Sequence, residues 1–358
     1  MKRIIERKHA GGLLLLAPLM SILCPTNGSL AAVPGGTAVA YVTNSGGDDV
    51  TVINLKTRRM AGSIVVGGGV HGACGPANGR QVFFTVMSTR TLKIVDTATN
   101  EVTGSVSLVS HPVGARPNQC ASTPDGRYVA VPMRFYGGQQ SALGDVDIID
   151  MDQRKVVKVL PLRFPHNCAG AGSNEVLYCE TRAEGQIYRL NLRTESFDRE
   201  FSVGRDPRPF VIVTEARRIY SALGGFHGFV VVDTDTGQIH RVPLPDAGPE
   251  SPLCQRYEPN TPTHGVALAP DGQELWVTSM DNASVYAYDI GSGTLSRPIH
   301  TGACPNWISI TPNGEYVTVS NSGEDTMSII DAGRQKVLAD IKVGKTPKRL
   351  LAINVPGP

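Results

Sequence analysis

An alternating apolar segment that ends in Asp or Asn recurs seven times along this chain of 358 residues. The last residues of successive copies lie 42, 54, 41, 42, 56 and 42 positions apart. A period near 42 residues is the length of one four-stranded blade of a β-propeller, and the two longer intervals indicate insertions. The segments end at Asn54, Asp96, Asp150, Asn191, Asp233, Asp289 and Asp331.

Turn sequences give a second register that agrees with the first. Asn-Gly or Asp-Gly pairs at 78–79, 125–126, 271–272 and 313–314 each precede a β-rich segment, as in hairpins that join the first two strands of a blade. The 39 Gly and 25 Pro also fit many short strands joined by turns. We therefore predict an all-β, seven-bladed β-propeller with four-stranded antiparallel blades.

The two ends of the repeat predict how the ring closes. The first unit begins at 37–41 without an inner strand, whereas 348–354 has the pattern of an inner strand with no blade of its own. We expect the C-terminal strand to complete the first blade, because this closure hides the strand edges that an open array would expose.

Several motifs also carry a resemblance to a known family. Tyr41-Val-Thr-Asn44, Trp276-Val-Thr-Ser279, the Pro-Asp-Gly turns and the segment 95–100 resemble the YVTN-type repeat of seven-bladed propellers. The resemblance recurs in every unit and covers the chain beyond its first residues. It implies the architecture and leaves the function open, since that family includes surface proteins, periplasmic binding propellers and enzymes.

The N-terminus is typical of a secretory signal peptide. Basic residues precede an apolar run over 11–23, and small residues follow at 29–32. We expect cleavage of 1–31, which leaves 32–358 as a single propeller domain in the periplasm or outside the cell. The apolar run is too short to span a membrane, and the mature chain is nearly neutral, so neither a membrane span nor nucleic-acid binding is expected.

Six cysteines remain after removal of Cys24, which lies in a poor context for lipidation. An even number in an exported protein favours disulfides. Two of them, at 168 and 179, face each other across one hairpin, and a bond between 254 and 304 would pin the longer insertion over the rim of the ring. The remaining pair lies on neighbouring inner strands, offset by one position. The predicted bonds are Cys168–Cys179, Cys254–Cys304 and Cys74–Cys120.

One polar residue per unit begins the inner strand and faces the mouth of the channel. Three of these residues are histidines on alternate blades, and three converging imidazoles can hold a divalent transition metal with an open position. Basic side chains on the same rim would attract an anionic ligand. The alternatives are a ligand-binding mouth without metal and a structural ring whose residues only form hydrogen bonds in a water-filled channel. The metal residues are His71, His166 and His264, and the ligand-binding residues are Asn118, Arg208, Asn306 and Lys348.

Loops on the same face offer further chemistry. Both insertions, at 132–145 and 243–263, open there and would wall a pocket over the channel. His227 lies in such a loop and is a candidate fourth ligand or general base. Loop positions are also expected for Glu180, Arg134 and Tyr136, which would supply a carboxylate, an anion clamp and a phenol.

These features give two hypotheses for the function. The first is a small-ligand site at the channel mouth, with a metal on three histidines and an anionic ligand, and with lyase or hydrolase activity in which His227, Arg208, Tyr136 and Glu180 are the catalytic candidates. The second is a non-catalytic propeller that recognises a protein, polymer or surface. The chain contains no Gly-rich phosphate loop, nucleophile elbow, HExxH or CxxCH motif, which argues against nucleotide hydrolysis, common serine esterases and covalent haem.

Overall fold

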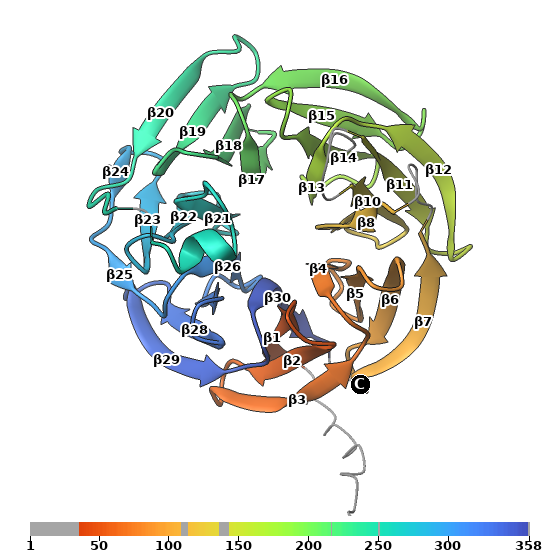
Figure 1. The fold of residues 1–358 in the computed structure, drawn as a ribbon, viewed down its shortest axis with the longest axis horizontal. Helices are drawn as coiled ribbons and strands as arrows, with labels where there is room; N and C mark the ends of the chain where they lie inside the picture. Colours follow the sequence, from red (N-terminus) through yellow and green to blue (C-terminus); the bar gives the residue numbers. More distant parts are fainter. Residues whose placement is uncertain (1–35, 109–113, 136–142, 216, 250, 357–358) are drawn as a thin grey trace, which may run out of the picture.

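A computed structural model describes residues 36–108, 114–135, 143–215, 217–249 and 251–356. The predicted signal peptide lies outside these residues. The described chain forms a ring of seven antiparallel sheets around a central axis (Figure 1). None of its helices has the length and apolar character needed to cross a membrane.

The first four blades follow the chain in order around the ring. Blade 1 contains β1 (Thr37–Asn44), β2 (Asp49–Asn54), β3 (Arg59–Val65) and the C-terminal β30 (Pro347–Val355). Blade 2 contains β4 (Val70–Cys74), β5 (Gln81–Val86), β6 (Thr91–Asp96) and β7 (Glu101–Ser107). Blade 3 contains β8 (Arg116–Pro117), β9 (Ala121–Ser122), β10 (Tyr128–Arg134), β11 (Gly144–Asp150) and β12 (Lys155–Pro161). Blade 4 contains β13 (Pro165–Gly170), β14 (Val176–Thr181), β15 (Gln186–Asn191) and β16 (Ser196–Ser202).

The last three blades complete the circle. Blade 5 contains β17 (Pro207–Val213), β18 (Arg218–Leu223), β19 (Gly228–Asp233) and β20 (Ile239–Pro243). Blade 6 contains β21 (Thr263–Leu268), β22 (Glu274–Ser279), β23 (Ser284–Asp289), β24 (Thr294–Leu295) and β25 (Ile299–His300). Blade 7 contains β26 (Pro305–Ile310), β27 (Tyr316–Asn321), β28 (Thr326–Asp331) and β29 (Lys336–Lys342). The prediction of an all-β, seven-bladed propeller with four-stranded blades is confirmed.

The ring closes through the C-terminal strand, as the sequence predicted. β30 is the inner strand of blade 1 and pairs antiparallel with β1, from Thr37 opposite Val355 to Asn44 opposite Pro347. The closing strand also buries apolar side chains, among them Leu350 and Ile353. Closure therefore joins segments from the two ends of the described chain in one sheet.

The hydrophobic core lies between neighbouring blades. Val39 and Tyr41 of blade 1, for example, pack in one cluster with Val82 and Phe84 of blade 2. Each recurrent Asp or Asn ends the third strand of its blade and accepts hydrogen bonds from the following turn, as Asp96 Oδ1 does from two backbone N–H groups at 2.9 and 3.0 Å. The repeat in the sequence therefore records a turn that every blade needs.

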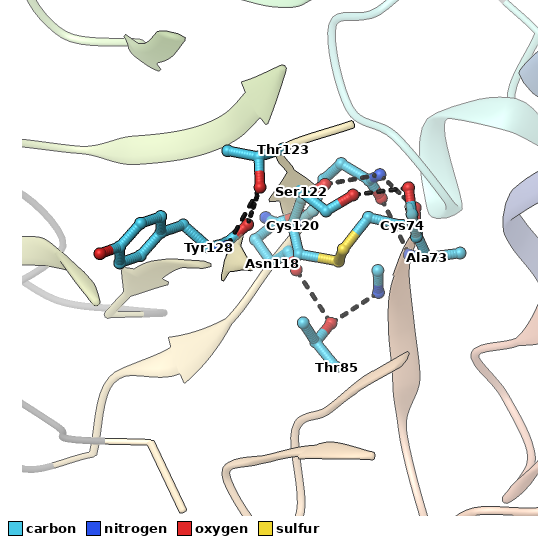
Figure 2. Close-up of a disulfide and its surroundings, with 11 residues drawn as sticks. Ala73, Cys74, Thr85, Asn118, Cys120, Ser122, Thr123 and Tyr128 are labelled. Carbon is cyan, nitrogen blue, oxygen red and sulfur yellow. Dashed lines mark hydrogen bonds between the residues drawn. A yellow bond between two sulfur atoms is a disulfide. The ribbon is translucent and has the colours of Figure 1, made fainter. Parts of the chain in front are cut away.

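All three predicted disulfides are present: Cys74–Cys120, Cys168–Cys179 and Cys254–Cys304. The first joins blade 2 to the interrupted inner strand of blade 3, where Cys120 lies between β8 and β9 (Figure 2). That interruption lets two cysteines offset by one position face each other. The last bond joins the insertion at 243–263 to the loop before β26.

Candidate functional site

The residues predicted for the channel mouth lie where the inner strands depart from regular pairing. In six blades the ladder next to the inner strand shifts register at this position, and in blade 3 the inner strand is interrupted. A β-bulge re-aims the side chain that it carries, here toward the channel. We call this end of the channel the upper mouth, and its residues are His71, Asn118, His166, Arg208, His264, Asn306 and Lys348.

A hydroxyl on the second strand fixes the bulge in four blades. These hydroxyls accept a hydrogen bond from an inner-strand N–H at distances between 2.7 and 3.1 Å, and that of Thr85 also donates to the Asn118 carbonyl of the next blade. The repeated Thr or Ser is therefore structural. Blade 4 has Glu180 at the corresponding position. The hydroxyl residues are Thr43, Thr85, Thr278 and Ser320.

Glu180 forms a buried cluster with the neighbouring inner strand. Its Oε1 lies 2.7 Å from Nδ1 of His166 and accepts a hydrogen bond from Asn167 Nδ2 at 2.6 Å. Burial raises the pKa of the Glu180 carboxyl well above its ordinary value, and burial together with Arg182 lowers the pKa of His166. Both shifts favour a protonated Glu180 beside a neutral His166. The expectation that Glu180 lies in a loop is wrong, because β14 continues to Thr181.

His264 has one ring nitrogen bound and one without a partner. Its Nδ1 lies 2.7 Å from the backbone oxygen of Asn306, which can only accept, so Nδ1 carries the proton. Nε2 is buried and has no hydrogen-bond partner. Burial lowers the pKa of His264 to about 3, despite the opposing charge of Glu258. The imidazole is therefore neutral and presents a lone pair.

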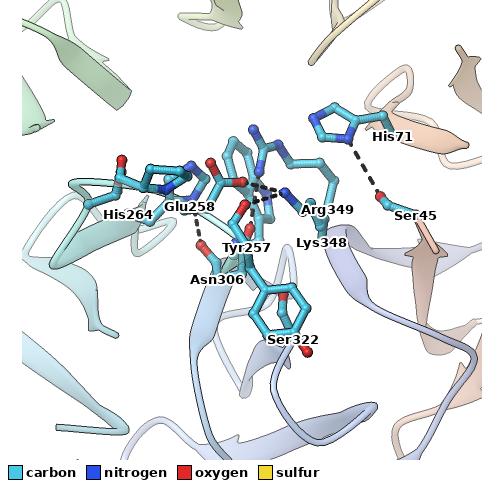
Figure 3. Close-up of polar contacts among 12 residues, drawn as sticks. Ser45, His71, Tyr257, Glu258, His264, Asn306, Ser322, Lys348 and Arg349 are labelled. Atoms are coloured by element: carbon cyan, nitrogen blue, oxygen red, sulfur yellow. Dashed lines mark hydrogen bonds and ion pairs between the residues drawn. The ribbon is translucent and has the colours of Figure 1, made fainter. Parts of the chain in front are cut away.

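The three histidines lie at one mouth but do not form a compact metal site. The rings of His166 and His264 are 6.5 Å apart between centroids, in an edge-on arrangement. His71 projects from blade 2, and burial, Arg349 and Lys348 lower its pKa well below the ordinary value (Figure 3). Within the described part of the chain, no group of three or more His, Cys, Asp or Glu side chains is placed to hold a metal ion. Metal binding by all three histidines stays a prediction.

The insertion at 243–263 brings an acidic side chain to the mouth. It contains the short helix η2 (Cys254–Arg256), followed by Tyr257 and Glu258. Lys348 Nζ donates to Glu258 Oε1 at 2.8 Å and to the Tyr257 backbone oxygen at 2.7 Å (Figure 3). Burial acts to raise the pKa of Glu258, but the charges of Lys348 and Arg349 hold it well below its ordinary value. Lys348 thus anchors the insertion. The sequence analysis did not identify Glu258 as a residue of the site.

Arg208 lies almost fully buried on β17. One guanidinium nitrogen donates to Asp206 and to the Pro259 backbone oxygen, both at 3.1 Å. Its Nε has no hydrogen-bond partner. Burial and the charge of Arg182 lower the pKa of Arg208 to about 10, so it remains a cation at neutral pH.

Arg349, which the sequence did not single out, occupies the next position on β30. Its guanidinium carbon lies 4.2 Å from the centre of the Trp307 ring, and one nitrogen donates to Asn306 Oδ1 at 3.1 Å. Trp307 also contacts His264, with 5.8 Å between ring centroids. The residue after the mouth position differs from blade to blade, from Gly72 and Gly265 to Gln119, so the repeat did not single out either residue.

Arg134 and His227 are also described by the structure, and neither belongs to the ring of mouth residues. Arg134 ends β10, so the loop position expected for it is wrong, and it lines a cavity of about 550 Å³ with Arg182 and Asp206. Its charge contributes to the lowered pKa of His166. His227 lies in the predicted loop, with Nε2 2.7 Å from the Ser279 hydroxyl, and burial lowers its pKa. Tyr136 lies outside the described residues.

The fold and the site define a seven-bladed β-propeller with a polar, charged ring at one end of its channel. No family model matches the chain, and no curated protein matches it either. The YVTN-type repeat therefore stays a prediction from the sequence.

Solved structures of the same fold are numerous. Hydrazine synthase of Kuenenia stuttgartiensis matches with a TM-score of 0.67 at 14% identity, over 87% of this chain and 99% of that chain. A functionally unknown protein from Desulfotomaculum acetoxidans matches with a TM-score of 0.68 at 13% identity, over 88% and 99%. The dihydro-heme d1 dehydrogenase NirN matches with a TM-score of 0.60 at 14% identity, over 93% and 78%. At these identities the likeness shows the fold alone.

Proposed function

We propose that the upper mouth binds a small carboxylate that also carries a hydroxyl or amino group. The observation that carries this proposal is a set of buried polar atoms without hydrogen-bond partners on four consecutive blades. Leaving such a group unpaired costs about 1–3 kcal/mol, so each calls for a partner. The atoms are Glu180 Oε2, Arg208 Nε, His264 Nε2 and Asn306 Nδ2.

The chemistry of these atoms defines the ligand. Arg208 Nε and Asn306 Nδ2 are donors, which suits a carboxylate, while the lone pair on His264 Nε2 accepts a hydrogen bond from a hydroxyl or amine. Among the described residues whose charges act on His71, His166 or Arg208, cations outnumber ionised carboxylates. The cations are Arg134, Arg182, Arg208, Lys348 and Arg349, and the carboxylates are Asp206 and Glu258.

Binding should be measured by titration calorimetry with L-malate, and with succinate, which lacks the hydroxyl. Arg208→Gln removes a charged donor and should weaken malate binding at least tenfold, as expected for a hydrogen bond to a charged group. Lys345→Gln is the matched control, because it removes an equal charge from an exposed position before β30 and should leave the affinity unchanged. Equal effects of the two substitutions, or no binding of either acid, would refute the proposal.

A second candidate adds a divalent transition metal to the same mouth. It is favoured by His264, whose Nδ1–H group contacts a backbone carbonyl, an arrangement that commonly orients a metal-ligating imidazole. Metal on His264, His71 and His166 could polarise a bound carboxylate or carbonyl, and His227 or Glu180 would then move the proton in a lyase or hydrolase reaction.

Elemental mass spectrometry of protein purified without nickel affinity tests this candidate. About one metal per chain, lost when all three histidines are changed to Ala, would support it. No metal after reconstitution would reject it and leave carboxylate binding unaffected. If malate binding and metal are both absent, the non-catalytic propeller that recognises a macromolecular partner becomes the better explanation.

A further inference from the structure

The opposite end of the channel contains a cavity with different chemistry. Its volume is about 660 Å³, within the usual range for small-molecule sites. We call this end the lower mouth. Among the described residues that line it, Glu215 alone is charged, in contrast to the upper mouth. Half-buried apolar side chains from four inner strands form part of its wall: Val213, Leu268, Ile310 and Leu351.

Trp307 contacts residues of the upper mouth and also lines the lower cavity. The guanidinium of Arg349 lies over the Trp307 ring, with its carbon 4.2 Å from the ring centre. Trp307 itself lines the lower cavity and is half-buried. Trp307 can therefore offer its remaining surface to a planar ring, since aromatic rings stack favourably at offset or edge-on geometries.

Asn167 supplies a polar contact for the same cavity. Its side chain is only 2% exposed and lines the cavity wall. Its amide nitrogen donates to Glu180, whereas its Oδ1 is buried without a hydrogen-bond partner. The cavity therefore combines an aromatic surface with an acceptor that lacks a donor.

We propose that the lower mouth binds a neutral, planar aromatic molecule with an N–H or O–H group, which stacks on Trp307 and donates a hydrogen bond to Asn167 Oδ1. The described wall contains no cation and one carboxylate, that of Glu215, which disfavours an ionic ligand. Its apolar side chains favour an aromatic one. This cavity adjoins the upper mouth, because Asn167 donates to Glu180 and Trp307 contacts Arg349 and His264. The two proposals rest on different unpartnered atoms, so each can fail without the other.

N-phenyl-1-naphthylamine is a suitable probe, because it is neutral, aromatic and carries one N–H group. The chain has 2 Trp, and Trp276 is fully buried and does not line the cavity. In Trp276→Phe, excitation of Trp307 should therefore produce energy transfer to the bound probe. In Trp307→Phe the probe should lose most of its affinity and show no transfer from the channel.

Matched controls localise the binding. Ile310→Glu places a charge in the cavity wall and should weaken probe binding at least tenfold, whereas Val65→Glu on the exposed outer strand of blade 1 should not. The analogue 1-phenylnaphthalene lacks the N–H group and should bind about tenfold more weakly, with that preference lost in Asn167→Leu. Absence of probe binding, or binding that is equal in Ile310→Glu and Val65→Glu, would overturn the proposal whatever the result with malate.

Discussion

Replacing Glu180 with Gln should make the folded chain more stable at alkaline pH, although the residue is buried at the centre of the site. Glu180 and His166 hold one proton between them in the folded state, because burial raises the pKa of the carboxyl and lowers that of the imidazole. In the unfolded chain both groups are deprotonated above about pH 6.5. Above that pH the unfolded state therefore binds one proton fewer than the folded state.

The size of the effect follows from proton linkage. Each proton that the folded state retains lowers the free energy of unfolding by about 1.4 kcal/mol per pH unit, as the pH rises from about 6.5 toward the raised pKa. Between about pH 4.3 and 6.5 both states hold one proton, so the pair contributes no slope there. Glu180→Gln has no such proton to retain, and its stability should be flat above pH 6.5.

Urea unfolding at about pH 7 and about pH 8 measures this difference. The wild type should lose more stability than Glu180→Gln over that interval, by up to about 1.4 kcal/mol. Glu175→Gln is the matched control, since it makes the same substitution at an exposed position just before β14. Equal slopes for the wild type and Glu180→Gln would show that the buried pair does not retain its proton.

Three further predictions concern the ring, the insertion and the acid limb. Deleting residues from Lys345 onward removes β30 and its buried apolar side chains, each of which stabilises the fold by about 1.5–3 kcal/mol. The melting temperature should therefore fall, and an unchanged melting temperature would contradict closure by β30. Replacing both Cys254 and Cys304 with Ser should free the insertion and so weaken the binding of malate. An unchanged affinity in titration calorimetry would contradict this. The pKa of His264, about 3, lies below its unfolded value, so stability is lost as pH falls from about 6.5 toward 3. In acid urea titrations His264→Asn should flatten that loss and His300→Asn should not.

The fold could be predicted because each blade repeats the same local requirements. An Asp or Asn ends the third strand of every blade, and a Gly with positive φ lies in turns between the inner and second strands, as at Gly79 (64°) and Gly272 (72°). These requirements leave a period in the sequence. The disulfide pairs followed from the same register, which places Cys74 and Cys120 on neighbouring inner strands.

The site was predicted only in part, because its chemistry departs from the repeat. Glu258 lies in an insertion that has no counterpart in other blades, so no register placed it at the mouth. Arg349 and Trp307 follow a bulge, and alternation along a regular strand does not give the direction of side chains next to a bulge. Glu180 was placed in a loop because the end of β14 cannot be read from an apolar pattern that a buried carboxyl interrupts.

Nitrogen-15 NMR of histidine-labelled protein tests ligand binding at the upper mouth most directly, with His264→Asn used to assign the resonance. We expect a neutral His264 protonated on Nδ1 at neutral pH, with an unprotonated Nε2 whose resonance moves when L-malate is added. A His264 resonance that does not move at saturating malate, or an imidazole protonated on Nε2, would contradict a ligand site built around this nitrogen.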